Sequence, residues 1–441
     1  MDYEKLKNSQ LNLKFSNIKE ITSEPQQNNA ESFQNGKKIS VLFRNTIPEI
    51  PYTTYGVFSI YKYPAKFIPQ VIAFVLKKYG VPGMRIFDPF AGYGTAGLTA
   101  KVYGYNYQLW DLNPILNIIH DTATLGRPKM KVNELLDLID CIKNSNKEFI
   151  PSWSNLNYWF PEQFLPILSK AWGFVHSEKE KEKKYLLLIP LLKVTKYFSW
   201  SDEKVHKLYR SKYSRKKIET LLKGNWKNVF YRMLKQEIFS LYNKLVEYEK
   251  LSPKEVEYEV KAGIDTLTAE LDKKVDILIT SPPYLQAQEY IRSTKLELFW
   301  LGYSEAYIKN LSNKEIPYRE VPKIKIYSST FFEYRKKIKE KHLRSLYDQY
   351  FHAILSCFSR LGEKVENYMC IFVGPAKVRN NPIPIDEIIV EHLKEFGWSH
   401  EVTFVDKILS RVMFESKVNP ASGMKDSRIK TEHLVVLKKQ K

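Results

Sequence analysis

Cysteine is scarce in this chain. Only Cys141, Cys357 and Cys370 occur among its 441 residues, and no two of them form a Cys-x-x-Cys pair. This number and spacing argue against a disulfide framework and against a cysteine-ligated zinc site. We therefore expect a protein of a reducing compartment, without a metal site.

Long apolar runs are also missing. The longest candidate, residues 185–192, is much shorter than a membrane span and is interrupted by Pro190. The residues that follow Met1 are rich in Asn, Gln, Lys and Ser and lack the apolar core and small-residue cleavage site of a signal peptide. We therefore expect no transmembrane segment, no membrane partner and a cytoplasmic location.

Acidic residues are outnumbered by basic ones. The chain has 69 Lys and Arg against 49 Asp and Glu, which gives a net charge of +20. An excess of this size indicates a polyanionic partner, nucleic acid foremost, because each neutralised phosphate releases condensed counterions. A lysine-rich surface that reflects an AT-rich genome would give the same count, so charge alone leaves both interpretations open.

The pattern of apolar residues predicts an α/β protein with one doubly wound sheet. The polar residues 1–38 indicate a flexible leader. Between 118 and 255 the patterns are helical only, which predicts a largely helical insertion between 39–117 and 256–441, the two parts of the sheet domain. The expected strands are 84–87, 107–110, 256–260, 276–279, 368–373, 400–405 and 433–437, and the expected helices include 67–79, 96–103, 294–301, 331–361 and 385–396.

A glycine-rich turn follows the first of the central strands, in the segment Asp88–Thr95. Gly92 and Gly94 can approach a ligand closely and adopt positive φ, and the helix that follows offers free N–H groups. Asp111 lies 17 residues beyond Gly94, near the interval at which an acid grips ribose hydroxyls. Asp88 would repel a pyrophosphate but attract an ammonium group, and S-adenosylmethionine carries both an ammonium and a ribose. Taken alone, a Gly-x-Gly turn is weak evidence, and a purely structural turn is then the favoured interpretation.

A second motif, Thr280-Ser-Pro-Pro-Tyr284, follows the strand at 276–279. Two consecutive prolines fix φ and remove two backbone donors, so carbonyl oxygens and the Ser281 hydroxyl are presented at the edge of the sheet. Such acceptors can hold the protons of an exocyclic amine, and Tyr284 adds a ring on which an extruded base could stack. A plain Pro-Pro turn is the alternative if the motif is considered in isolation.

Four segments together resemble the motifs of DNA amino-methyltransferases, which methylate N4 of cytosine or N6 of adenine with S-adenosylmethionine. They are Tyr63–Phe67, Asp88–Thr95, Asp111–Pro114 and Thr280–Tyr284. The resemblance implies a Rossmann-like class I methyltransferase fold, double-stranded DNA as substrate and, in a restriction-modification system, a separately encoded endonuclease as partner. A serine at the first position of the tetrad is more usual in cytosine-N4 enzymes, so cytosine is favoured over adenine.

The same resemblance implies roles for individual residues. The catalytic tetrad is Ser281, Pro282, Pro283 and Tyr284. The implied cofactor-binding residues are Lys66, Phe67, Asp88, Phe90, Ala91, Gly92, Gly94, Thr95, Asp111, Leu112, Asn113 and, after the third strand, Asp265, which would take the adenine amine.

The helical insertion contains a basic segment with two interleaved tyrosines, Tyr209 and Tyr213. Its composition suits phosphate contacts with a few base-edge readers, although a solvated helix face is as good an account of any single lysine. The candidate DNA-binding residues are Lys204, Lys207, Arg210, Lys212, Arg215, Lys216 and Lys217.

Other classes of protein fit less well. A C5 methyltransferase needs a nucleophilic cysteine, typically after a proline, and none of the three cysteines has that neighbour. Asp406 with Glu415 and Lys417 loosely fits a metal-dependent nuclease pattern, but the spacing is common by chance. A non-catalytic nucleic-acid-binding protein and an RNA methyltransferase remain open alternatives.

Overall fold

The computed structural model describes residues 37–440, apart from 206–207, 286–288, 380 and 409–430. The predicted leader therefore lies outside the described residues except for its last two positions. These two positions open the first strand, β1 (Lys37–Val41), which the polar composition of the region had not predicted.

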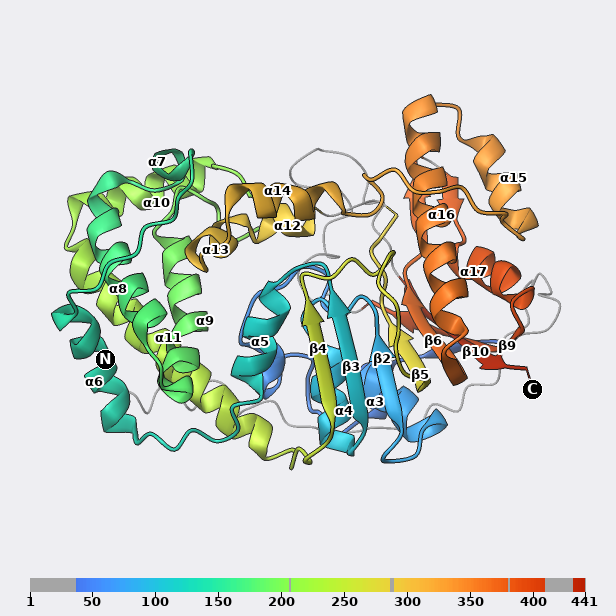
Figure 1. The fold of residues 1–441 in the computed structure, drawn as a ribbon, viewed down its shortest axis with the longest axis horizontal. Coiled ribbons are helices and arrows are strands. Elements are labelled where there is room, and N and C mark those ends of the chain that lie inside the picture. Colours follow the sequence, from blue (N-terminus) through green and yellow to red (C-terminus); the bar gives the residue numbers. More distant parts are fainter. Residues whose placement is uncertain (1–36, 206–207, 286–288, 380, 409–430, 441) are drawn as a thin grey trace, which may run out of the picture. The chain divides into compact units, whose positions relative to one another are not determined.

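A single eight-stranded sheet forms the centre of the described chain, in the order β1-β9-β10-β6-β5-β2-β3-β4 (Figure 1). The five strands from β4 to β6 run parallel, β10 is antiparallel to both of its neighbours, and β1 adds parallel to β9. The bounds are β2 (Arg85–Asp88), β3 (Asn106–Asp111), β4 (Tyr258–Ala262), β5 (Val275–Thr280), β6 (Val365–Val373), β9 (Trp398–Lys407) and β10 (Thr431–Lys439). The predicted doubly wound α/β class is confirmed.

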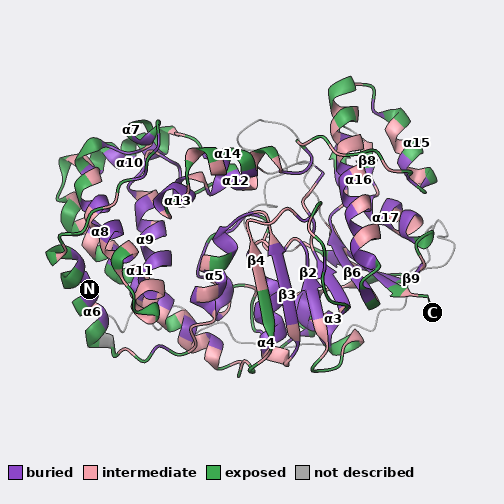
Figure 2. Cartoon of the chain, viewed as in Figure 1, coloured by how far each residue is buried: buried purple, intermediate pink, exposed green. Residues whose placement is uncertain are grey.

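Helices cover both faces of the sheet because the central strands are apolar on both sides. One face packs Ile277 and Ile279 with α3 (Pro69–Tyr79) and α4 (Thr95–Tyr103). The opposite face packs Leu278 against α16 (Lys341–Gly362) and α17 (Ile385–Lys394). Figure 2 shows the resulting buried strands between half-buried helices.

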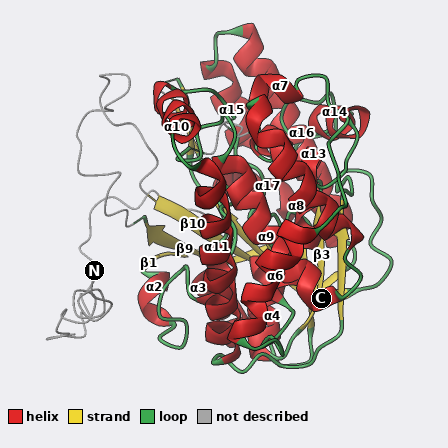
Figure 3. Cartoon of the chain, turned by 90° about the vertical axis from the view of Figure 1, so that its left-hand side faces the viewer, coloured by secondary structure: helices red, strands yellow, loops and turns green. Residues whose placement is uncertain are grey.

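The described part of the segment between β3 and β4 contains helices and no strand, as the patterns predicted. Figure 3 shows these helices in front of the sheet. Their core also takes residues from beyond the predicted insertion, because Phe299 of α13 stacks on Trp153 at 4.2 Å between ring centroids. The helices of this body are α5 (Ile115–Ala123), α6 (Val132–Asn144), α7 (Leu156–Trp159), α8 (Leu165–Ser177), α9 (Lys181–Tyr197), α10 (Lys212–Lys223), α11 (Trp226–Glu249), α12 (Tyr290–Ser293), α13 (Lys295–Trp300) and α14 (Glu305–Asn313), with the 3-10 turn η2 (Glu162–Phe164).

The helix predicted over 331–361 is in fact two helices, α15 (Ser329–Lys337) and α16, joined by a corner. Ile338 leaves the helical conformation, with φ −87° and ψ 106°, and its side chain is buried. A short hairpin, β7 (Ala376–Val378) and β8 (Asn381–Ile383), was likewise not predicted. The remaining elements are α2 (Phe43–Thr46) and η1 (Gly56–Ser59). Within the described chain, no helix combines the length and apolarity that crossing a bilayer requires.

Candidate active site

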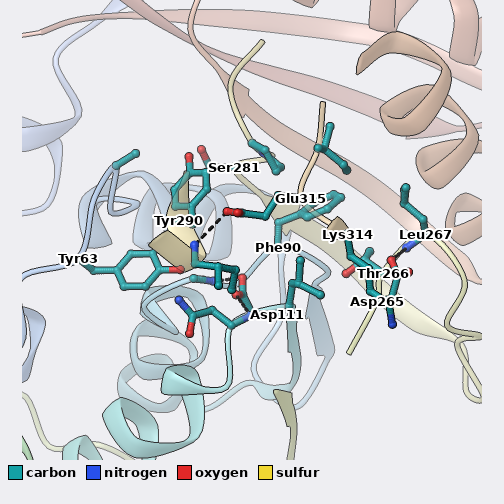
Figure 4. A pocket seen from close by; sticks show the side chains of 17 residues that line it. Tyr63, Phe90, Asp111, Asp265, Thr266, Leu267, Ser281, Tyr290, Lys314 and Glu315 are labelled. Atoms are coloured by element: carbon teal, nitrogen blue, oxygen red, sulfur yellow. Dashed lines mark hydrogen bonds between the residues drawn. The ribbon is translucent and has the colours of Figure 1, made fainter. Parts of the chain in front are cut away.

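A pocket lies at the carboxyl ends of four neighbouring strands (Figure 4). Gly92 follows β2, Asp111 ends β3, Asp265 follows β4 and Ser281 follows β5, and all four line the pocket. Parallel strands bring their carboxyl ends to one edge, so four motifs spread over the sequence meet in space. The other predicted site residues that line this pocket are Phe90, Leu112, Asn113 and Pro283.

The glycine turn adopts the conformation that its composition predicted. Gly92 has φ 52°, and Gly94, at the N-cap of α4, has φ 84°, both in the left-handed region. A Cβ atom at Gly92 would lie 3.0 Å from the ring of Tyr63, which also lines the pocket. The turn therefore needs glycine for its backbone and for its close approach to Tyr63.

Asp111 is fixed by two backbone groups. Its Oδ2 accepts the N–H of Gly92 at 2.7 Å and its Oδ1 accepts the N–H of Asn113 at 2.8 Å. Burial raises the pKa of Asp111 to about 6, although these two hydrogen bonds act in the opposite direction. Each carboxylate oxygen can accept a further hydrogen bond from a ligand in the pocket.

Asp88 is buried at the end of β2 and is not part of the pocket lining. Its Oδ1 accepts the Thr280 hydroxyl at 2.6 Å and the Phe90 N–H at 3.1 Å. Burial raises the pKa of Asp88 to about 7. These contacts tie the end of β2 to the end of β5, directly before Ser281. The predicted attraction of Asp88 for a cofactor ammonium stays a prediction.

Two charged residues at the pocket were missed by the sequence analysis. Arg319 Nη1 lies 2.8 and 2.7 Å from the two carboxylate oxygens of Asp265. Glu315 accepts the N–H of Ile291 at 2.9 Å, and burial raises the pKa of Glu315 to about 7. Both follow α14, about 50 residues after Asp265, and no local pattern marks them.

Two tyrosine rings line the pocket, Tyr63 and Tyr290. Tyr63 and Tyr290 are stacked, with 6.4 Å between ring centroids and 22° between planes. Tyr284, in contrast, is not among the lining residues, and its hydroxyl donates to Glu432 Oε1 of β10 at 2.9 Å. Tyr63 belongs to the Tyr63–Phe67 segment, in which the sequence predicted a role only for Lys66 and Phe67.

Several residues that the resemblance assigned to the cofactor lie outside the pocket lining. The Lys66 ammonium donates to the carbonyls of Phe58 and Thr53, and burial lowers the pKa of Lys66 to about 8. Phe67 stacks on Phe372 at 5.3 Å. Ala91, Gly94 and Thr95 are buried and are also absent from the lining, as is Pro282 of the predicted catalytic tetrad.

In the basic segment of the insertion, some of the predicted DNA-binding residues are exposed, and others are already held by contacts within the protein. Lys217 is buried and pairs with Glu203 at 2.7 Å. The guanidinium of Arg210 lies over the rings of Tyr158 and Trp200, at 4.7 and 4.8 Å. Lys207 falls outside the described residues. The exposed members are Lys204, whose ammonium lies over Tyr213, and Lys212, Arg215 and Lys216.

The cysteines offer no nucleophile at this pocket. Cys357 and Cys370 are buried, and burial raises the pKa of the Cys357 thiol to about 12. Cys141 is exposed on α6. Among the described residues, no cluster of three or more His, Cys, Asp or Glu side chains is arranged to hold a metal ion. Glu415 and Lys417 of the nuclease pattern lie outside the described residues.

Comparison with known proteins gives the family resemblance. A Type II methyltransferase of Kocuria varians, M.MvaI, is 23% identical over 409 residues, which cover 85% of this chain and 89% of that protein. The chain is similar to Type II methyltransferases. M.BsoBI of Geobacillus stearothermophilus is 26% identical over 312 residues, 62% of this chain and 59% of that protein.

A third Type II methyltransferase, M.MjaII of Methanocaldococcus jannaschii, is 32% identical over 96 residues, or 22% of this chain and 18% of that protein. No family model matches the chain. The resemblance to methyltransferases of the restriction-modification type, which the four motifs predicted, is thereby confirmed. The choice between N4 and N6 is not decided by these relatives.

Proposed function

We propose that this chain is a site-specific DNA methyltransferase that transfers a methyl group from S-adenosylmethionine to N4 of a flipped cytosine. The observation that carries the proposal is the pocket, where the glycine turn, Asp111, Asp265 and Ser281 meet at the carboxyl ends of β2, β3, β4 and β5. This edge is where open α/β sheets bind their ligands. The similarity to Type II methyltransferases along most of the chain supports the reaction class.

The pocket has the chemistry that S-adenosylmethionine requires. Asp111 and Glu315 line it with carboxylates, which favour a ligand that carries a sulfonium and an ammonium group. Asp111 keeps acceptor capacity for ribose hydroxyls. Phe90, Leu267 and Ile316 supply apolar walls for an adenine ring. When bound, this cofactor supplies a methyl group that its sulfonium makes electrophilic.

Ser281 is the residue that we assign to the base amine. The lone pair of an exocyclic amine is delocalised into the ring, so the amine is a weak nucleophile. The Ser281 hydroxyl and neighbouring carbonyl oxygens can accept its protons and favour a pyramidal nitrogen. Pro282 and Pro283 have no N–H to compete for these acceptors. The hydrogen bond between Asp88 and Thr280 fixes the strand end from which Ser281 projects.

The choice of cytosine rests on the serine at the first tetrad position. The test is to incubate the full chain with double-stranded DNA and S-adenosylmethionine, digest the DNA to nucleosides and identify the methylated base by mass spectrometry. N4-methylcytosine is the expected product, and Ser281→Ala should reduce it strongly. N6-methyladenine would overturn only the choice of base, whereas 5-methylcytosine would overturn the amino-methyltransferase assignment.

Two further outcomes concern the substrate. Methylation of RNA without methylation of DNA would assign the alternative substrate, and cofactor binding without any methyl transfer would favour a binding protein. In a restriction-modification system, the product of this reaction protects sites from a separately encoded endonuclease. Sequencing the methylated bases in DNA from cells that express the chain would identify that site.

A further inference from the structure

The corner between α15 and α16, residues 335–344, has an unusual excess of positive charge. It contains six Lys or Arg and a single acid, Glu340. Lys336, Lys339 and Lys341 are exposed, and within the described part of the chain none of their ammonium groups forms an ion pair. These three lysines are therefore available to a partner.

The backbone of this corner is held firmly. Arg335 forms a bidentate ion pair with Asp348, in which Nε and Nη2 donate to the two carboxylate oxygens at 2.6 and 2.7 Å. Arg344 donates twice to the carbonyl of Ile338, at 2.9 and 2.7 Å. The three exposed lysines thus project from a preorganised turn rather than from a loose loop, which lowers the entropic cost of ordering them on binding.

The fold places the corner on the same edge of the sheet as the pocket. β6 runs parallel to β5, and α16 leads into β6 through a short connection, so the N-terminus of α16 lies toward the carboxyl edge. The hairpin that follows β6 reaches the corner there, because Arg379 pairs with Glu340 at 3.1 Å. Figure 1 shows α16 rising beyond the strand ends, with α15 beside it.

An exposed aromatic ring accompanies the charge. Phe332 of α15 is 49% exposed and precedes Lys336 by one helical turn, so the two side chains share a face. A large exposed ring beside unpaired lysines is the composition of a nucleic-acid surface, where cations meet phosphates and rings meet sugars or bases.

We propose that the α15–α16 corner is a second DNA-binding surface, which grips the duplex on the side of the pocket opposite α10. This inference rests on the proposed function. Figure 1 shows α10 and α15 on opposite sides of the carboxyl edge of β2–β5. Lys212, Arg215 and Lys216 of α10 and Lys336, Lys339 and Lys341 of the corner then contact phosphates on the two flanks of the flipped base.

The test measures binding of a fluorescent DNA duplex over a range of salt concentrations. Changing Lys336, Lys339 and Lys341 together to Gln should weaken binding about tenfold or more and reduce the salt slope by about 2 to 3, close to one unit per lost phosphate contact. The matched control changes Lys78, Lys273 and Lys364, exposed lysines that precede β2, β5 and β6 at the opposite edge, to Gln. This control should leave both quantities unchanged.

A second variant tests the aromatic part of the surface. Phe332→Ala should weaken duplex binding while leaving the salt slope unchanged, because it removes no charge. The proposal is overturned if the triple corner variant keeps the wild-type slope, or if the control variant loses as much. These measurements need no methyl transfer, so an inactive wild-type chain that still binds through the corner would contradict the proposed function and leave the surface assignment standing.

Discussion

Asp111 is ionised only above a pH of about 6, because burial raises its pKa. A ligand with a sulfonium and an ammonium binds the ionised carboxylate better than the protonated one. The affinity for S-adenosylmethionine should therefore fall as the pH drops through 6, to about tenfold weaker at pH 5 than at pH 8. Calorimetric titrations across this range measure the effect.

Asp111→Asn provides the control for this pH dependence. The variant should bind S-adenosylmethionine about tenfold more weakly at pH 8, since a charge-assisted contact contributes about 1.5–3 kcal/mol. It should also show a flatter pH profile than the wild type. A profile as steep as that of the wild type would assign the titration to another carboxylate, with Glu315 as the neighbouring candidate.

Tyr284 and Glu432 should act as a unit in positioning the tetrad. Tyr284→Phe and Glu432→Ala each remove the same hydrogen bond, so we expect each to slow methylation several-fold and the double variant to be no slower than either. The sequence motif assigned the Tyr284 ring to stacking on the extruded base, and on that prediction Tyr284→Ala should cost more, by about 1–3 kcal/mol. Single-turnover methylation measures the rates, and cofactor binding should be unchanged. Additive losses would show that the hydroxyl and the carboxylate act independently.

Helix α4 packs unusually closely on the sheet through Gly97. A Cβ atom there would lie 2.6 Å from the ring of Tyr107 and 2.8 Å from the Leu109 side chain, both on β3. Gly97→Ala should destabilise the protein by about 1–3 kcal/mol, because the helix that carries the glycine turn must shift outward. Urea unfolding measures the loss.

Gly224 is the matched control for the change at Gly97. Its added Cβ would meet only carbonyl oxygens at 3.6 and 3.7 Å, which is ordinary contact, and its backbone is extended, with a φ of −110° that any residue can adopt. Gly224→Ala should leave the free energy of unfolding nearly unchanged. Equal losses at the two positions would mean that the packing of α4 on β3 is not the cause.

The central elements could be predicted from the sequence because their signals are local. β2, β3 and β5 are short apolar runs followed by glycine or proline turns, and the motifs at their ends mark the pocket. β1 could not be predicted, because an edge strand of mixed polarity acquires its conformation only by pairing with β9. The break between α15 and α16 was hidden because Ile338 fits a helical pattern and leaves the helix to reach a buried site.

The missing members of the candidate site have a similar explanation. Glu315 lines the pocket and accepts the Ile291 N–H, whereas Arg319 pairs with Asp265 of the lining, and only the tertiary fold creates these contacts. Lys217 shows the converse case. Its basic neighbours suggested a contact with a DNA phosphate, but its ammonium forms an ion pair with the Glu203 carboxylate instead. Composition predicts the kind of surface but does not tell which cations are already paired.

Across the whole molecule, the helical insertion separates two strands that lie side by side. β3 ends at Asp111 and β4 begins at Tyr258, yet the two pair in register along five positions. A pairing over such a sequence distance forms slowly, because closing a long loop costs entropy before any contact is gained. The helices of the insertion can pack into an apolar core first. This packing brings the ends of β3 and β4 closer together and so lowers the entropic cost of pairing the two strands.

The pairing of β1 with β9 also protects the protein against self-association through the edge of its sheet. Without β1, the ten-residue strand β9 would present its unpaired N–H and C=O groups at the border of the sheet, where a second copy could add its own strand. At the other border, β4 is short and carries Glu259 and Lys261, which discourage such joining. Removal of residues 1–41 should therefore cause concentration-dependent self-association, whereas removal of 1–36, which keeps β1, should not. Light scattering of the two truncated chains measures the difference, and equal behaviour would mean that β9 needs no cover.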